Sequence, residues 1–190
     1  MRACVPAAGR MYTSRMTTRL RSARRWAVGI ALFVAVVLAG KAVSLSMLSG
    51  DIDARAAAVS AFYQSSIETH VPPLLESRGM GAGEREALQL LLDRSAALDG
   101  TADAVVRAQQ AFEATPPTLR TRPGFTPLET ALSKGGTVQP LLDAHNVVAQ
   151  QWNNQEEGLL GSVFVRTLRL KPQLLLQADG KVEYETTVTL

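Results

Sequence analysis

Residues Trp26 to Leu48 read WAVGIALFVAVVLAGKAVSLSML, a run without any acidic side chain. A helix rises about 1.5 Å per residue, so this run would reach roughly 34 Å, whereas the hydrocarbon core of a bilayer is about 30 Å thick. Its one charged residue is Lys41, whose ammonium can reach the outer interface while its methylene stem stays in the apolar layer. The run therefore predicts a transmembrane anchor over residues 26–48.

The segment in front of this anchor, residues 1–25, is basic. It contains seven arginines and no Asp or Glu, and such segments stay on the cytoplasmic side of a membrane. Everything after Gly50 is then expected outside. The 20 Lys and Arg of the chain include these seven arginines and Lys41, which leaves 12 for the exported part against all 17 Asp and Glu, a net charge of −5. Nucleic-acid binding requires a basic face, so no nucleic-acid partner is predicted.

Two other interpretations of the N-terminal segment remain open. A cleaved secretory signal needs a basic region, an apolar run of about 7–15 residues and a small-residue exit site, which residues 26–42 would supply. The apolar run continues to Leu48, however, and this length favours an uncleaved anchor. Arg with Ser and Thr but no acid is also typical of a mitochondrial transit peptide, although the hydrophobic block directly behind it fits a bacterial anchor better. Met11 or Met16 could be the true start.

The exported part is long enough for one hydrophobic core. Cys4 is the only cysteine and precedes the anchor, so neither a disulfide nor a multi-thiolate metal site can hold this part together. Apolar residues recur at intervals of three and four through most of residues 51–172, as on one face of a helix. We therefore expect an all-α fold, in which the transmembrane helix is followed by an antiparallel bundle of three to four helices.

The helix boundaries within residues 51–172 follow from their breaking residues. Pro72 and Pro73 are expected to bend or break the first helix, because each lacks a donor and clashes with the preceding turn. The connection from Thr115 to Pro127 contains four prolines and is not expected to be regular helix. The expected apolar faces are Ile52, Ala56, Val59, Phe62 or Tyr63, Ile67 and Val71; Leu88, Leu91, Leu92, Ser95 and Leu98; Val105, Val106, Gln109 and Phe112; and Leu128, Leu132, Val138, Leu141, Leu142, His145, Val148 and Trp152, interrupted at Gly135-Gly136.

Residues 173–190 have a different pattern. From Lys181 to Leu190 the sequence alternates with period two and is rich in β-branched residues. Asp179-Gly180 is a hairpin-type turn that could pair this run with Leu174 to Leu176. We expect a small β-hairpin or an unpaired tail, since a two-stranded ribbon is marginal unless it packs on the bundle.

Several short motifs follow one another between Ala54 and Pro172. Val71-Pro72-Pro73-Leu74-Leu75-Glu76 ends the first predicted helix, and a Glu-rich helix begins at Glu84. His145-Asn146-Val147-Val148-Ala149-Gln150-Gln151-Trp152-Asn153 then places two asparagines directly after aromatic rings, before Leu170-Lys171-Pro172. In order and spacing these motifs resemble the LemA family, which has an Ile-Pro-Asn-Leu-Val-like step, a Tyr-Asn, six residues, Asn pattern and a Phe-Lys-Pro step at the corresponding places.

The resemblance implies a divergent member of the LemA family. Members of that family have an N-terminal membrane helix that leads into an antiparallel helical bundle tethered to the cytoplasmic membrane, and their biochemical role is poorly defined. The resemblance brings no catalytic residue with it.

Asn146 and Asn153, with Trp152 and His145, are the candidate interaction or register residues. The two asparagines are seven residues apart and so share one face of a helix. Such a polar ladder could bind a partner. Alternatively, each amide could satisfy a main-chain group and fix the register of the bundle, as a buried Asn does in coiled coils, and we favour this second interpretation.

The sequence predicts neither a metal site nor a cofactor. Neither His70 nor His145 belongs to an HxxxH or HxxE pattern. The chain also has no Gly-x-Ser-x-Gly, Ser-x-x-Lys or Walker motif, and the Gly79 to Gly83 loop is interpreted as a hinge. An enzyme with a scattered, hydrolase-like site would first be sought at His145, Asp143 and Ser133.

Together these features predict a non-enzymatic envelope scaffold or adaptor of LemA type in the bacterial cytoplasmic (inner) membrane. Its N-terminus would be cytoplasmic and its bundle extracytoplasmic, with the lipid bilayer and a membrane or periplasmic protein as partners. The contact surface is sought at Trp152, Asn146, Asn153 and the Thr115 to Pro127 connection, and an exposed apolar patch could lie at Leu159 to Val165. The alternatives are an enzyme and a cleaved secreted protein.

Overall fold

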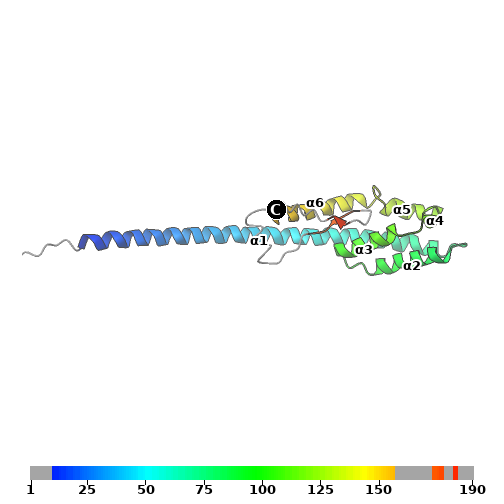
Figure 1. Cartoon of the computed structure of the whole chain (residues 1–190), viewed down its shortest axis with the longest axis horizontal. Helices are drawn as coiled ribbons and strands as arrows, with labels where there is room; N and C mark the ends of the chain where they lie inside the picture. The colour runs from blue at the N-terminus through cyan, green and yellow to red at the C-terminus, as the bar shows by residue number, and fades with distance from the viewer. Residues whose placement is uncertain (1–9, 157–172, 178–181, 184–190) are drawn as a thin grey trace, which may run out of the picture. The chain divides into compact units, whose positions relative to one another are not determined.

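The computed structural model describes residues 10–156, 173–177 and 182–183 (Figure 1). The regular structure in this part of the chain is helical apart from two short strands, so the predicted all-α fold is confirmed. By its internal contacts the chain divides into two compact units, Met1–Ser46 and Met47–Leu190. The elements are α1 (Arg10–Leu75), α2 (Ala82–Ala96), α3 (Ala102–Glu113), α4 (Pro117–Arg120), the 3₁₀-helix η1 (Pro123–Phe125), α5 (Thr126–Leu132), α6 (Gln139–Glu156), β1 (Leu175–Leu176) and β2 (Val182–Glu183).

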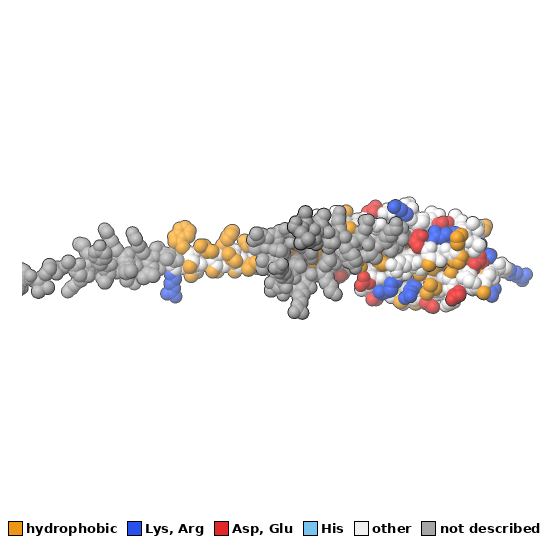
Figure 2. All heavy atoms as spheres, viewed as in Figure 1, with side chains coloured by type: hydrophobic (Ala, Val, Ile, Leu, Met, Phe, Trp, Pro, Cys, Tyr) orange, Lys and Arg blue, Asp and Glu red, His pale blue; other side chains and the backbone are white. Residues whose placement is uncertain are grey.

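In the first unit, most large apolar side chains of α1 between Trp26 and Val43 are exposed (Figure 2). Trp26, Phe33 and Val36 are 74%, 70% and 70% exposed. The mean hydropathy of the most apolar window reaches 2.3, and 6% of that window is buried. Among the described residues, α1 is the one helix that is long and apolar enough to cross a membrane. The predicted anchor over residues 26–48 lies entirely within it.

In the second unit, α1 buries a single stripe. Seven of its residues, spaced by three or four positions, are at most 5% exposed, namely Ile52, Ala56, Val59, Tyr63, Ile67, Val71 and Leu74. The predicted apolar face is therefore confirmed, with Tyr63 rather than Phe62 as its fully buried aromatic residue. Burying each large side chain of this kind stabilises the fold by about 1.5–3 kcal/mol.

Of the two outcomes predicted for Pro72 and Pro73, a bend or a break of this helix, the break does not occur. α1 continues through both prolines to Leu75, and the amide of Glu76 donates to the carbonyl of Pro72 at 3.3 Å. The two prolines lie in the last turn, so only the bonds to the preceding turn are lost, and burial of Val71 and Leu74 on either side holds the turn in place.

The second and third predicted helices correspond to α2 and α3. α2 begins two residues before Glu84, whose Oε2 accepts from the amide of Gly81 at 3.0 Å. α3 is capped by Thr101, whose Oγ1 accepts from the amide of Ala104 at 3.3 Å. Each cap satisfies amides that a helix start leaves without partners. The buried faces are Leu88, Leu91 and Ser95 on α2, and Val105, Val106, Gln109 and Phe112 on α3.

The proline-rich connection contains more helix than the sequence predicted. α4 and η1 both begin at a proline, because the first helical position has no use for an amide donor and favours the fixed proline φ. η1 places the Phe125 ring parallel to that of Phe112, with the ring centroids 5.9 Å apart. The connection is thereby fastened to the core through its aromatic residue.

The predicted interruption at Gly135-Gly136 is confirmed, since α5 ends at Leu132 and α6 begins at Gln139. The loop folds back on the end of α5, where the amide of Thr137 donates to the carbonyl of Thr130 at 3.1 Å. A Cβ on Gly136 would overlap the carbonyl oxygens of Thr130 and Ser133, so glycine is required at this close approach.

The C-terminal hairpin is present at the residues that the structure describes. β1 and β2 pair antiparallel, with Leu175 opposite Glu183 and Leu176 opposite Val182. The Leu176 side chain is 1% exposed and belongs to the hydrophobic core of the second unit. The core therefore extends beyond the predicted bundle boundary at residue 172. The predicted turn at Asp179-Gly180 lies outside the described residues.

Candidate functional site

The two predicted asparagines of α6 clamp the main chain of the segment Gln173–Gln177. Asn146 Nδ2 donates to the carbonyl of Leu176, and Asn146 Oδ1 accepts from the amide of Leu176, both at 2.7 Å. Asn153 Nδ2 donates to the carbonyl of Gln173 at 3.1 Å, and its Oδ1 accepts from the amide of Gln173 at 2.8 Å. Each side-chain amide thus supplies the donor and acceptor that a neighbouring strand would otherwise provide. We call this pair the asparagine ladder.

The adjacent histidine completes the clamp. His145 Nε2 lies 3.2 Å from the carbonyl of Leu174. A carbonyl can only accept, so Nε2 carries the proton. The side chain is fully buried, and its Nδ1 has no hydrogen-bond partner. Burial lowers the pKa of His145, the carbonyls of Leu174 and Ile52 oppose that shift in part, and Arg55 lowers the pKa further. The ring is therefore neutral at pH 7.

Trp152, which the sequence placed on a possible contact surface, is 5% exposed and packs inside the second unit. It is thus unsuited to touching a partner in this conformation. Asn146 and Asn153 are half-buried, and both ends of each amide are used within the chain. The geometry is that of register residues, because the ladder fixes which residues of the segment face which turn of α6.

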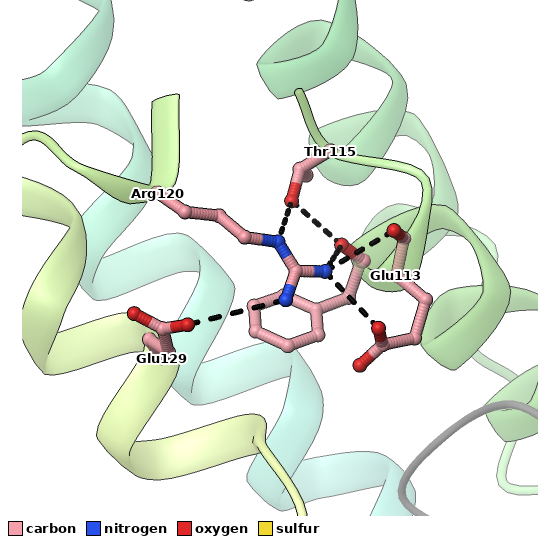
Figure 3. A network of polar contacts seen from close by, with 5 residues as sticks. Glu113, Thr115, Arg120 and Glu129 are labelled. Carbon is pink, nitrogen blue, oxygen red and sulfur yellow. Dashed lines mark hydrogen bonds and ion pairs between the residues drawn. The ribbon is translucent and has the colours of Figure 1, made fainter. Parts of the chain in front are cut away.

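A second polar cluster, which the sequence did not reveal, closes the corner between α3 and α4 (Figure 3). Arg120 Nη2 donates at 3.1 Å to the carbonyls of Phe112 and Glu113 and to Glu113 Oε2. Arg120 Nε donates to Thr115 Oγ1 at 3.2 Å, and the guanidinium lies 5.3 Å from the centre of the Phe112 ring. Nη1 is 3.9 Å from Glu129 Oε1. The guanidinium satisfies carbonyls at the end of α3, so it serves the fold.

A similar bridge joins the start of α2 to the loop before η1. Arg122 Nη2 donates to the carbonyl of Gly79 at 2.9 Å and to Glu84 Oε2 at 2.7 Å. The amide of Gly81 and the Arg122 guanidinium lower the pKa of the Glu84 carboxyl. The loop that the sequence identified as a glycine-rich hinge is therefore held by a residue 43 positions away from Gly79.

Two polar side chains of the core lack hydrogen bonds. The Tyr63 hydroxyl and both polar atoms of the Gln109 amide are buried without a partner. The two side chains lie near each other, but no hydrogen bond of acceptable geometry joins them. Burial raises the pKa of the Tyr63 hydroxyl far above its ordinary value. Tyr63 is thus protonated at any physiological pH.

A groove of about 810 Å³ runs between α1, the start of α3 and the segment 173–174. Its floor is apolar, and three exposed carboxylates line it, those of Asp53, Asp99 and Asp103. Asp99 accepts from the hydroxyl of Thr101 at 2.6 Å and from its amide at 3.0 Å, and these bonds lower the pKa of Asp99. Asp103 lies in the first turn of α3, where a negative charge favours the helix dipole. These two carboxylates therefore have capping roles.

The residues named for an enzymatic alternative are not assembled into one site. His145 contacts Leu174, Asp143 accepts from Gln139 Nε2 at 2.8 Å, and the Ser133 carbonyl accepts from the amide of Gly136. Among residues whose positions are described, no group of three His, Cys, Asp or Glu side chains could hold a metal ion. The predicted apolar patch at Leu159 to Val165 and the Leu170-Lys171-Pro172 motif lie outside the described residues.

No protein-family model, curated protein or solved structure matches this chain.

Proposed function

We propose that this chain is a LemA-like envelope scaffold or adaptor, anchored in the bacterial cytoplasmic membrane by residues 26–48. Its basic N-terminal segment would be cytoplasmic, and the chain after Gly50 would lie on the extracytoplasmic side. The observation that carries the proposal is the uncovered apolar stretch of α1, with Trp26, Phe33 and Val36 at least 70% exposed. Such a surface is stable in lipid and unfavourable in water.

A non-enzymatic role is supported by how the bundle uses its polar side chains. Asn146, Asn153, His145 and Arg120 are the residue types from which sites are often built, yet each is engaged with main-chain groups of the same chain. They rigidify the bundle and so favour a protein that presents a fixed surface to a membrane or periplasmic partner.

The topology is tested by cysteine labelling in intact cells. The native Cys4 reports on the N-terminal side, and a Cys4→Ser, Val147→Cys variant reports on α6, where Val147 is 56% exposed. A membrane-impermeant maleimide should label the thiol introduced by Val147→Cys in intact spheroplasts and should label Cys4 only after lysis. Labelling of Cys4 before lysis, or recovery of the full-length protein in the soluble fraction, would contradict the proposal.

The scaffold role is tested by photocrosslinking in cells. A photoreactive residue is placed at the exposed positions Gln151 and Glu86, with the buried Leu142 as a matched control. The proposal expects crosslinking to a protein partner from at least one of the two exposed positions and no crosslinking from Leu142. Recovery of no protein partner from either surface position would argue against a scaffold.

A further inference from the structure

The attachment of segment 173–177 to α6 combines permanent and titratable contacts. The asparagine ladder cannot change its charge, whereas His145 can. All of these contacts go to main-chain atoms of Gln173, Leu174 and Leu176, and the Leu176 side chain then fills the core. The segment is thus a strap whose hold on α6 includes one group that responds to pH.

The surroundings of the His145 ring favour its neutral form. The side chain is 0% exposed, and its Nδ1 makes no hydrogen bond. The carbonyls of Leu174 and Ile52 favour the charged ring, but burial has the larger effect and lowers the pKa. On α1, the charged side chain that acts on the ring is Arg55, which repels a second positive charge. The strap, QLLLQ, carries no titratable side chain.

The carboxylates near His145 lie at positions exposed to water. On α6 itself, Asp143 is exposed and accepts a hydrogen bond from Gln139. Asp53, Asp99 and Asp103 line the groove to which Ile52 and Leu174 also contribute, and all three are exposed to water. Water screens exposed charges strongly, whereas burial of the ring acts on His145 directly.

We propose that His145 makes release of the strap acid-sensitive: uptake of a proton by its buried imidazole raises the equilibrium constant for opening Gln173–Gln177 from α6, because opening returns the charged ring to water. The biological use of this release rests on the proposed topology, because an extracytoplasmic domain meets the pH of the surroundings. Release would uncover the polar face of α6 and the core site of Leu176. Acid would thereby raise the fraction of molecules in which this surface is uncovered.

Proton linkage sets the size of the effect. An imidazole freed from the closed site returns to its ordinary pKa of 6.5. If the closed site keeps the ring neutral, the equilibrium constant for opening should rise about tenfold between pH 7.5 and 5.5. Above pH 7.5 it should be nearly constant, because the ring is neutral in both states.

Amide hydrogen exchange of the full chain in detergent micelles tests the proposal. The reporters are the amides of Gln173 and Leu176, which donate to the asparagine ladder, and the protection factors are corrected for intrinsic exchange at each pH. The protection of both amides should fall, by up to about tenfold, from pH 7.5 to 5.5, while that of Val105 in α3 stays constant. Protection that is unchanged across this range would overturn the proposal.

Two variants identify the titrating group. His145→Gln should hold the protection of the strap constant over the same pH range, and the matched control His70→Gln should retain the full pH dependence. An equal loss of protection in His145→Gln would overturn the proposal. If His145→Gln does not fold, NMR titration of the wild-type imidazole replaces it. An ordinary pKa of the imidazole, measured while the strap amides remain protected, would overturn the proposal. These measurements do not depend on cellular topology, so their failure and that of the scaffold proposal are distinguishable.

Discussion

The two parts of α1, one in each unit of the chain, use apolar residues in opposite ways. From Trp26 to Val43 most large apolar side chains are exposed, whereas from Ile52 to Leu74 they form one stripe and are buried. The polar positions make the difference, since Asp53, Arg55 and Glu68 occupy the remaining faces only in the second unit. A helix that is apolar all round matches lipid, and a helix with one apolar stripe matches a protein core. The periodicity of the sequence thus distinguishes the exposed apolar stretch of α1 from its buried stripe.

The largest effect is expected from breaking the lipid-facing pattern. Leu32→Asp combined with Val36→Asp places two charges in the middle of the anchor, and each should disfavour insertion by about 2.5–3.5 kcal/mol. The protein should move from the membrane to the soluble or aggregated fraction, measured by fractionation and carbonate extraction. Leu90→Asp on α2, where Leu90 is 42% exposed, is the control and should remain in the membrane.

The buried stripe is tested next, through the stability of the second unit. Ile67→Ala removes a fully buried side chain and should lower the free energy of unfolding by about 2–5 kcal/mol. Ser65→Ala, on the exposed side of the same helix, should change it by less than about 0.5 kcal/mol. Both are measured by urea denaturation in detergent micelles. Equal effects would show that the two faces are not distinguished as described.

A smaller effect is expected from the asparagine ladder. Asn146→Ala leaves the amide and carbonyl of Leu176 without partners and should destabilise the fold by about 1–3 kcal/mol. Asn154→Ala, one position beyond the ladder and exposed, is the matched control and should change stability by less than about 0.5 kcal/mol. Thermal unfolding followed by circular dichroism compares the two. An Asn146→Ala variant with unchanged stability would show that the asparagine ladder does not fix the register.

The smallest effect is the pH dependence of stability. The pKa of His145 is lowered in the folded state, so the unfolded chain binds the proton more readily. The stability is nearly constant above about pH 7.5 and falls as the pH drops through 6.5 toward the folded pKa, by up to about 1.4 kcal/mol between pH 7.5 and 5.5. Calorimetry should show a falling Tm in this range and a flatter profile for His145→Gln. Identical profiles would exclude His145 as the cause.

The sequence was sufficient for features that depend on local spacing. The long apolar stretch of α1, the α1 stripe and the break at Gly135-Gly136 follow from periodicity and from residues with special backbone preferences. Whether α1 continues through Pro72 and Pro73 or breaks there was left open by the sequence, because the outcome depends on tertiary burial of the last turn. The helix propensities of single residues do not include this tertiary burial.

The polar clusters required the structure. Spacing placed Asn146 and Asn153 on one face, but their partners are 30 and 20 residues away and are main-chain atoms of a segment that the sequence marked only as a possible hairpin strand. Arg120 gave no signal either, since its acceptors are carbonyls, which every residue has. Contacts between a side chain and a distant main chain leave little trace in residue identities.

The main-chain character of the ladder has a consequence for protein engineering. Because Asn153 binds the amide and carbonyl of Gln173 and ignores its side chain, that position tolerates any residue that keeps an extended backbone and a free N–H. Proline is the one standard residue without that N–H. Gln173 is therefore a suitable position for a fluorescent reporter, which would move with the strap without weakening its attachment to α6.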